Sequence, residues 1–117
     1  MNKFSIKMPL NGEYMTTARL AVGGLCALAG FDVDSAEDYK VCVTESLLIL
    51  QRSGFTHASL AFTVGETLAC KLIGEGACQP TPSAEDEISH ALLAALIGKV
   101  DYEKDESGKV LAIGFEG

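Results

Sequence analysis

The chain has 117 residues, with nine basic and sixteen acidic side chains, so its formal net charge is −7. Hydrophobic residues make up 48% of the sequence. The length predicts one folded domain, residues 1–117. The hydrophobic share is enough for a core and excludes a disordered chain. The acidic balance argues against a nucleic-acid-binding protein, which needs a basic face to meet phosphate.

The sequence predicts neither a membrane span nor a signal peptide. No apolar run approaches the roughly 20 residues of a span, and residues 1–10 lack the apolar core of an export signal. We therefore expect a cytoplasmic protein without a membrane partner. Its four cysteines form no C-x-x-C pair and are expected to be reduced and mostly buried: Cys26, Cys42, Cys70 and Cys78. His57 and His90 lack metal-ligand spacing, so we expect no metal site.

The predicted elements begin with a half-buried strand. Apolar and polar residues alternate from Lys3 to Met8, and the segment Pro9–Gly12 breaks the pattern. From about residue 13 to residue 29, apolar residues recur at helical spacing. The pair Gly23–Gly24 lies inside this helix, where each glycine costs roughly 1 kcal/mol relative to alanine. We expect the pair to let another helix approach closely.

A second helix is expected after Gly30, which ends the first. Two registers fit its start, with Asp34 or Ser35 as the capping residue and an acidic residue three positions later. The helix should reach about Arg52. Its apolar residues form one stripe: Tyr39, Val43, Leu47 and Leu50.

The second half of the chain is expected to form two hairpins with a loop and a helix between them. The four strands are Leu60–Val64 with Leu68–Leu72, and Val100–Lys104 with Lys109–Phe115. Residues 74–83 contain two glycines and two prolines without periodicity, which predicts a loop. Ser83 should cap a third helix that runs to about Gly98.

The predicted order of elements is therefore β-α-α-β-β-α-β-β. Strands joined by short hairpins imply a mixed, mostly antiparallel sheet, and three amphipathic helices are expected to cover one of its faces. The predicted fold class is an α+β two-layer sandwich.

Residues 38–50, D-Y-K-V-C-V-T-E-S-L-L-I-L, resemble the motif-bearing helix of the bacterial anti-sigma-factor serine kinases. Those kinases belong to the histidine-kinase-like (GHKL) ATPase superfamily, and their helix reads roughly D-L-K-I-A-V-S-E-A-x-x-N-A. The matching residues here are Asp38, Lys40, Val43, Thr44 and Glu45. The order of elements is similar along essentially the whole chain, and the third helix and last hairpin resemble the C-terminal end of the family. The resemblance implies a GHKL-like domain.

The resemblance also implies an ATP–Mg²⁺ site, but key positions are altered. In the family, a glutamate orients or deprotonates the attacking hydroxyl, and an asparagine one turn later helps to hold Mg²⁺. Glu45 is the candidate base, whereas Ile49 stands where the asparagine should be and has no lone pair. The adenine-binding D-x-G segment corresponds to residues 74–76, with Gly74 in place of the aspartate and Gly76 retained. These four positions make up a degenerate nucleotide pocket.

The phosphate-binding part is altered as well. The family has a long lid ending in a glycine-rich turn whose N–H groups meet the triphosphate. Here the loop has only about ten residues, and residues 87–90 occupy the place of the turn. Glu75 and the acidic run 85–87 lie in the same region. At an effective dielectric near 20, one like charge about 4 Å away costs on the order of 4 kcal/mol. A helix dipole contributes only about 0.3–1 kcal/mol.

Each of these residues also has a structural explanation. Glu45 is a polar residue of an amphipathic helix, and Gly74 and Gly76 fit loop positions with positive φ. The acidic residues 85–87 favour the first turn of a helix.

The main hypothesis is a regulatory protein-binding module that has lost ATP binding and kinase activity and needs no cofactor. The resemblance implies a sigma factor or an anti-sigma antagonist as partner, a homodimer, and partner contacts on the first helix near Arg19. The alternative is an ATP-dependent serine-protein kinase that acts on a sigma-factor antagonist and uses ATP and Mg²⁺ through altered residues. A third possibility is a different small molecule bound between Glu45 and Gly76.

Overall fold

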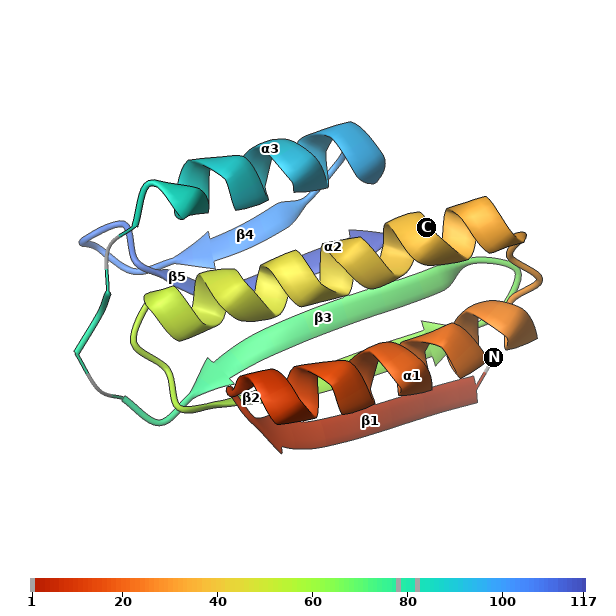
Figure 1. The fold of residues 1–117 in the computed structure, drawn as a ribbon, viewed down its shortest axis with the longest axis horizontal. Coiled ribbons are helices and arrows are strands. Elements are labelled where there is room, and N and C mark those ends of the chain that lie inside the picture. The colour runs from red at the N-terminus through yellow and green to blue at the C-terminus, as the bar shows by residue number, and fades with distance from the viewer. Residues whose placement is uncertain (1, 78, 82) are drawn as a thin grey trace.

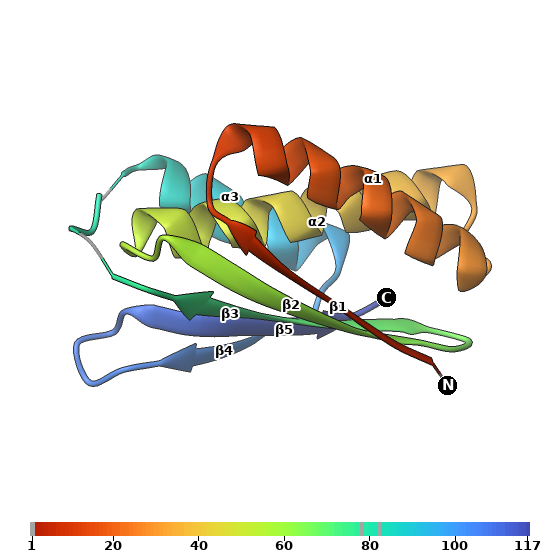
Figure 2. The same ribbon diagram turned by 90° about the horizontal axis from the view of Figure 1, so that it is seen from below.

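The protein folds as two layers, a five-stranded sheet and three helices on one of its faces (Figures 1 and 2). The structure, a computed structural model, describes residues 2–77, 79–81 and 83–117. The elements are β1 (Asn2–Pro9), α1 (Gly12–Leu28), α2 (Val33–Arg52), β2 (His57–Val64), β3 (Leu68–Glu75), α3 (Glu85–Leu96), β4 (Asp101–Lys104) and β5 (Val110–Glu116). The predicted order and the predicted two-layer sandwich are confirmed.

The strands lie in the order β1-β2-β3-β5-β4, and all four neighbouring pairs are antiparallel. β1 pairs with β2 from Asn2 opposite Val64 to Pro9 opposite His57, although two helices separate the strands in the sequence. β2 and β3 are longer than predicted. His57 begins β2, and Gly74, expected in a loop, pairs with Ala58 inside β3. The small and polar residues in these extensions hide the alternation of a strand.

The helix starts show where side-chain capping was misassigned. The N-cap of α2 is Asp32, whose carboxylate accepts a hydrogen bond from the Ser35 N–H at 2.7 Å, so neither Asp34 nor Ser35 is the cap. The Ser83 hydroxyl accepts from the Glu85 N–H at 3.1 Å, but the N-cap position of α3 belongs to Ala84.

No helix in the described part of the chain is long and apolar enough to cross a bilayer.

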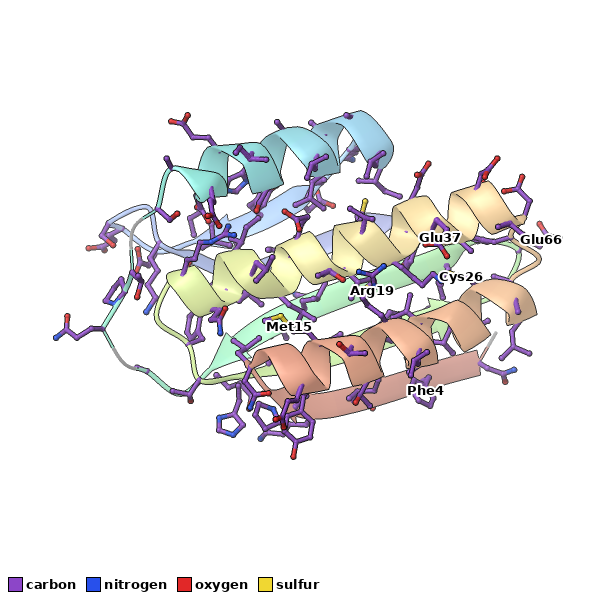
Figure 3. All side chains as sticks on the ribbon, viewed as in Figure 1. Phe4, Met15, Arg19, Cys26, Glu37 and Glu66 are labelled. Atoms are coloured by element: carbon purple, nitrogen blue, oxygen red, sulfur yellow. The ribbon has the colours of Figure 1, made fainter. Side chains whose placement is uncertain are left out.

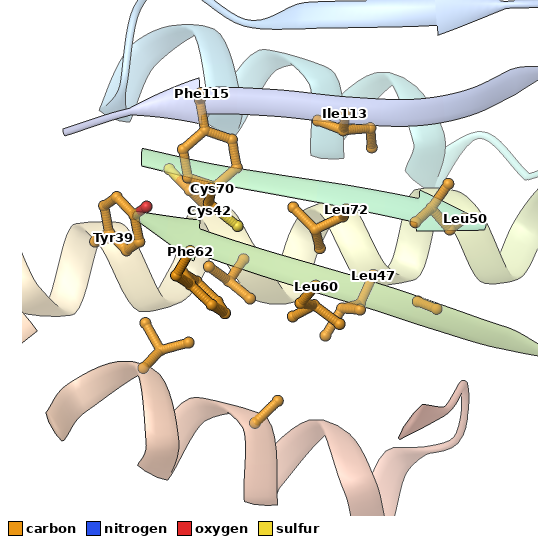
Figure 4. Packing of buried hydrophobic residues seen from close by; sticks show 14 of the residues in the cluster. Tyr39, Cys42, Leu47, Leu50, Leu60, Phe62, Cys70, Leu72, Ile113 and Phe115 are labelled. Atoms are coloured by element: carbon orange, nitrogen blue, oxygen red, sulfur yellow. The ribbon is translucent and has the colours of Figure 1, made fainter. Parts of the chain in front are cut away.

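The core lies between the sheet and the helices, with α2 running over its centre (Figure 4). Tyr39 of α2 is 1% exposed, and its hydroxyl donates to the Leu68 carbonyl at 2.9 Å. Its ring meets Phe31 and Phe115 edge-on, with centroids 5.5 and 5.3 Å away. These contacts join α2 to β3, β5 and the turn after α1, so α2 is the element around which the other elements pack.

Three cysteines are free thiols inside this core: Cys26, Cys42 and Cys70. Burial raises the pKa of each thiol, and that of Cys42 rises to about 11, with the nearby carboxylates of Asp38 and Glu45 adding to the effect. The predicted burial is thus confirmed for these three cysteines. Cys78 lies outside the described residues.

The expectation for Gly23–Gly24 is wrong. A Cβ built on Gly23 would lie 3.7 Å from the Lys40 side chain, which is an ordinary contact, and one built on Gly24 would meet nothing within 4 Å. Gly24 is exposed on α1. The glycine that does require close approach is Gly74, because a Cβ there would lie 2.3 Å from the Phe55 ring.

These two glycines give opposite expectations for the same substitution. Gly24→Ala should raise the free energy of unfolding by about 1 kcal/mol, because alanine costs less backbone entropy in a helix. Gly74→Ala should lower it by roughly 1–3 kcal/mol, because the Phe55 ring must move. Urea unfolding of both variants checks this, and a neutral Gly74→Ala would contradict the packing described here.

Candidate functional site

Glu45, the candidate base, lies on the side of α2 that faces α3. Its carboxylate accepts a hydrogen bond from the Ser89 hydroxyl at 2.9 Å, and the same hydroxyl accepts one from Arg52 Nη1 at 2.9 Å. Ser89 is 1% exposed. Glu45 is therefore one member of a hydrogen-bonded chain that joins the two helices.

Arg52, in the last turn of α2, is the centre of this chain. Its Nη1 lies 3.2 Å from Asp86 Oδ1, and its Nη2 lies 3.5 Å from Glu85 Oε2. The Arg52 carbonyl also accepts from the Thr81 N–H at 2.8 Å, which ties the end of the loop to the same turn. The Arg52 side chain is only 14% exposed, so its charge is compensated inside the protein. We call these residues the Arg52 cluster: Glu45, Arg52, Glu85, Asp86 and Ser89.

The cluster extends to β4 through His90 and Tyr102. His90 Nε2 lies 3.5 Å from Asp86 Oδ2, and His90 Nδ1 lies 3.0 Å from the Tyr102 hydroxyl. Burial, together with the charge of Asp86, raises the pKa of Tyr102. His90 thus helps to hold α3 against the sheet edge.

Ile49 lies one helical turn after Glu45 but belongs to the core. Its side chain is fully buried, and it offers no oxygen to a metal ion.

Gly74 and Gly76 lie beyond the C-terminal end of α2, against Phe55 and Thr56, the two residues directly before β2. Gly74 lies beneath the Phe55 ring, and a Cβ on Gly76 would meet the Thr56 hydroxyl. Lys109 stands over the same Phe55 ring, with Nζ 4.3 Å from its centroid. The φ of Gly76 is +71°, so the explanation as a loop glycine holds for Gly76. For Gly74 the loop explanation is wrong. Gly74 lies in β3 without a positive φ, and the absence of a side chain makes room for the Phe55 ring.

The four predicted positions contact different parts of the described structure. The Glu45 carboxylate is bonded to α3, whereas the two glycines contact residues that follow Arg52, about 10 Å further along the helix axis. Five surface hollows of about 220–530 Å³ lie among the described residues, and none of these five is lined by Glu45, Ile49, Gly74 or Gly76.

The residues present do not fit a magnesium-bound triphosphate. Such a ligand needs oxygen donors for the metal and N–H groups or cations for its phosphates. Glu45 already accepts a hydrogen bond, Ile49 has no donor atom, and Arg52 is engaged by acidic partners. The first turn of α3 carries three carboxylates, those of residues 85–87, which would repel phosphate.

Neither Arg52 nor Ser89 was predicted from the sequence as a residue of the site. Their side chains lie 37 positions apart in the sequence, so no local pattern joins them. The available signal was the acidic run at residues 85–87, which has more carboxylates than a helix start needs and so indicates a basic side chain nearby.

A second candidate surface lies between α1 and α2, around the predicted partner-contact residue Arg19. A hollow of about 430 Å³ is lined there by Thr16, Arg19, Leu20, Gly23, Glu37 and Lys40. Lys40 Nζ lies 2.6 Å from Glu37 Oε1, and that bond lowers the pKa of Glu37. Figure 3 shows Arg19 and Glu37 close together between the two helices. Leu20 beside them is 76% exposed, so the surface is both charged and apolar.

Comparison with known proteins points to one kind of relative. No protein-family profile matches the chain. A segment of 46 residues is 33% identical to the serine-protein kinases RsbW of Listeria monocytogenes and Listeria innocua. The match covers 39% of this chain and 29% of the length of those kinases. The similarity is weak and partial, and it indicates a relationship to RsbW.

Removing the central cation should release α3. In Arg52→Ala, Asp86 and Glu85 lose their partner and Ser89 loses a donor, so the free energy of unfolding should fall by roughly 1–3 kcal/mol. The rate of amide hydrogen exchange should increase more in α3 than in β2. The control is Arg19→Ala on α1, which should leave exchange in α3 unchanged. Equal protection of α3 in Arg52→Ala and the native protein would contradict the anchoring role.

Proposed function

We propose that this chain is a regulatory protein-binding domain related to the RsbW kinases. In this proposal the chain itself neither binds ATP nor transfers phosphate. The Arg52 cluster is the observation that carries the proposal. It fastens the first turn of α3 onto α2 through Ser89 and Asp86, at the place where the resemblance puts a nucleotide. A phosphate group there would have to displace carboxylates from Arg52.

The chemistry of the remaining positions supports the same proposal. An oxygen ligand for Mg²⁺ is missing at Ile49, which is buried in the core. An adenine-binding carboxylate is missing at Gly74, where the Phe55 ring leaves no room even for a Cβ. Changes at both ends of the expected site are independent of one another, and together they favour loss of the nucleotide over a variant mode of binding it.

The proposed partner is a protein of the sigma-factor pathway, either a sigma factor or an anti-sigma antagonist, met in the cytoplasm. The similarity to RsbW supports this assignment. The surface around Arg19 and Leu20 is suited to such contacts, because it offers a charged side chain beside an exposed apolar one. The proposed domain forms a homodimer and uses no cofactor.

The second candidate is an ATP-dependent serine-protein kinase. It is favoured by the name of the matched relatives and by Glu45, which keeps the residue type of a base on the matching helix. In that case Ser89 would have to release Glu45 when nucleotide binds.

Thermal unfolding with and without ATP–Mg²⁺ separates the two candidates. A ligand at about 100 times its dissociation constant stabilises the folded protein by about 2.7 kcal/mol. We expect no increase in melting temperature at millimolar ATP–Mg²⁺ beyond that seen with an equal ionic strength of salt. A clear, magnesium-dependent increase would overturn the proposal and support the kinase.

Ile49→Asn tests whether the metal ligand alone is missing. We expect the variant to be less stable, because the amide enters a fully buried position. We also expect no magnesium-dependent binding of a fluorescent ATP analogue, because the adenine and phosphate positions are altered too. Ile49→Ala is the matched control, since it disturbs the core without adding oxygen. Binding by Ile49→Asn but not by Ile49→Ala would show that only one ligand had been lost.

A further inference from the structure

β1 is an edge strand with one side available for pairing. It pairs with β2 over its whole length, Asn2–Pro9, and it stands at the end of the strand order (Figure 1). Half of the N–H and C=O groups of such a strand point away from its neighbour. Within the described residues, no strand pairs with this edge. An extended segment of another protein can therefore add to the sheet here.

An apolar hollow opens beside this edge, between β1 and the end of α1. It has a volume of about 530 Å³, and its apolar lining comes from Phe4, Leu25, Leu28 and Val64. Phe4 is 43% exposed and Leu28 is 76% exposed, and Figure 3 shows Phe4 below α1. Phe4 points to the helix side of the sheet, since it lies opposite the buried Phe62. Side chains of an added strand that point to this side would enter the hollow.

α1 supports the apolar character of this region. From Leu20 to Phe31 the chain has no charged residue, although Leu28 at the end of the helix is largely exposed. A helical segment without charges normally has both sides covered. The apolar side of the hollow thus has the composition of an interface.

The other face of β1 is basic, in a chain whose net charge is −7. Lys3 and Lys7 are exposed on the face that points away from the helices. Lys7 lies 2.8 Å from Glu75, whereas no side chain among the described residues pairs with Lys3. An added strand would place its own outer side chains next to these two lysines.

The same lysines argue against a second copy of this chain as the occupant. If two β1 strands paired about Ser5 with both helical layers on one face, each Lys3 would lie opposite the Lys7 of the other copy. Like charges directly opposite each other destabilise an antiparallel pair, and lysines on edge strands commonly prevent self-association. An acidic strand meets the opposite situation, because Lys3 gains a partner and Lys7 gains a second one beside Glu75.

We propose that the free edge of β1 and the hollow below α1 bind an extended segment of a protein partner in which acidic residues alternate with apolar ones. The acidic side chains meet Lys3 and Lys7, and the apolar ones enter the hollow beside Phe4 and Leu28. The rim residue Glu66 favours an uncharged or basic residue at that end of the segment. This inference rests on the proposed protein-binding function and adds a docking surface separate from the one around Arg19.

The test uses a fluorescent, end-blocked peptide of alternating glutamate and valine, about as long as β1, and the intact protein. Anisotropy should show saturable binding that weakens with salt, and the charge-reversed peptide of lysine and valine should not bind. Lys3→Glu should weaken binding about fivefold and Leu28→Glu about tenfold or more. The matched controls are Lys99→Glu, also exposed, and Leu20→Glu, which is as exposed as Leu28 on the same helix. Both controls should bind this peptide normally, because Lys99 and Leu20 lie outside β1 and the hollow beside it.

Amide hydrogen exchange on the complex should show new protection in β1. Absence of binding, or equal affinity for Leu28→Glu and Leu20→Glu, would overturn the inference. So would dimerisation of the free protein that Leu28→Glu abolishes in sedimentation, since a second copy would then occupy the edge. A natural protein partner bound equally by the native protein and Leu28→Glu would overturn this surface while leaving the proposed function intact.

Discussion

The compensation of one largely covered cation determines how α3 is held in this structure. Arg52 is largely covered, so its guanidinium needs anionic partners nearby, and Asp86 and Glu85 from α3 supply them, with Ser89 extending the contact to Glu45. Because those partners are the acidic residues of the α3 start, the same charges that satisfy Arg52 would repel a phosphate group placed beside them. The proposed loss of nucleotide binding would therefore share its physical origin with the fastening of α3.

The sequence predicted the architecture well because it depends on local patterns. Alternation and helical spacing identified every element, and the short connection between two alternating runs predicted the antiparallel pairing of β2 with β3. Ends that depend on one hydrogen bond were less predictable, as at Asp32, because several residues nearby can cap a helix. Gly74 was misassigned to a loop since a glycine that accommodates an aromatic ring looks the same in a sequence as one that permits positive φ.

The candidate site could be predicted only in its chemistry. The isoleucine at position 49 is visible in the sequence, but its full burial is not, because Ile49 lies outside the predicted apolar stripe of α2. The bond between Arg52 and Ser89 joins residues 37 positions apart, and such a pairing is decided by the packing of α2 against α3. The hollow beside β1 likewise arises only when β1, the end of α1 and the turn after β2 lie side by side. The similarity to RsbW supports a relationship and leaves the surfaces to be tested on this chain.

Closure of the Arg52 cluster to nucleotide can be measured by titrating the isotopically labelled protein with ATP–Mg²⁺ and following the backbone amides of Glu45, Gly76 and Ser89 by nuclear magnetic resonance. If the Arg52 cluster closes this place to nucleotide, these resonances should move no more than they do with an equal ionic strength of salt. Saturable changes confined to these residues, together with loss of protection in α3, would show that the cluster opens to admit ATP and would contradict the account.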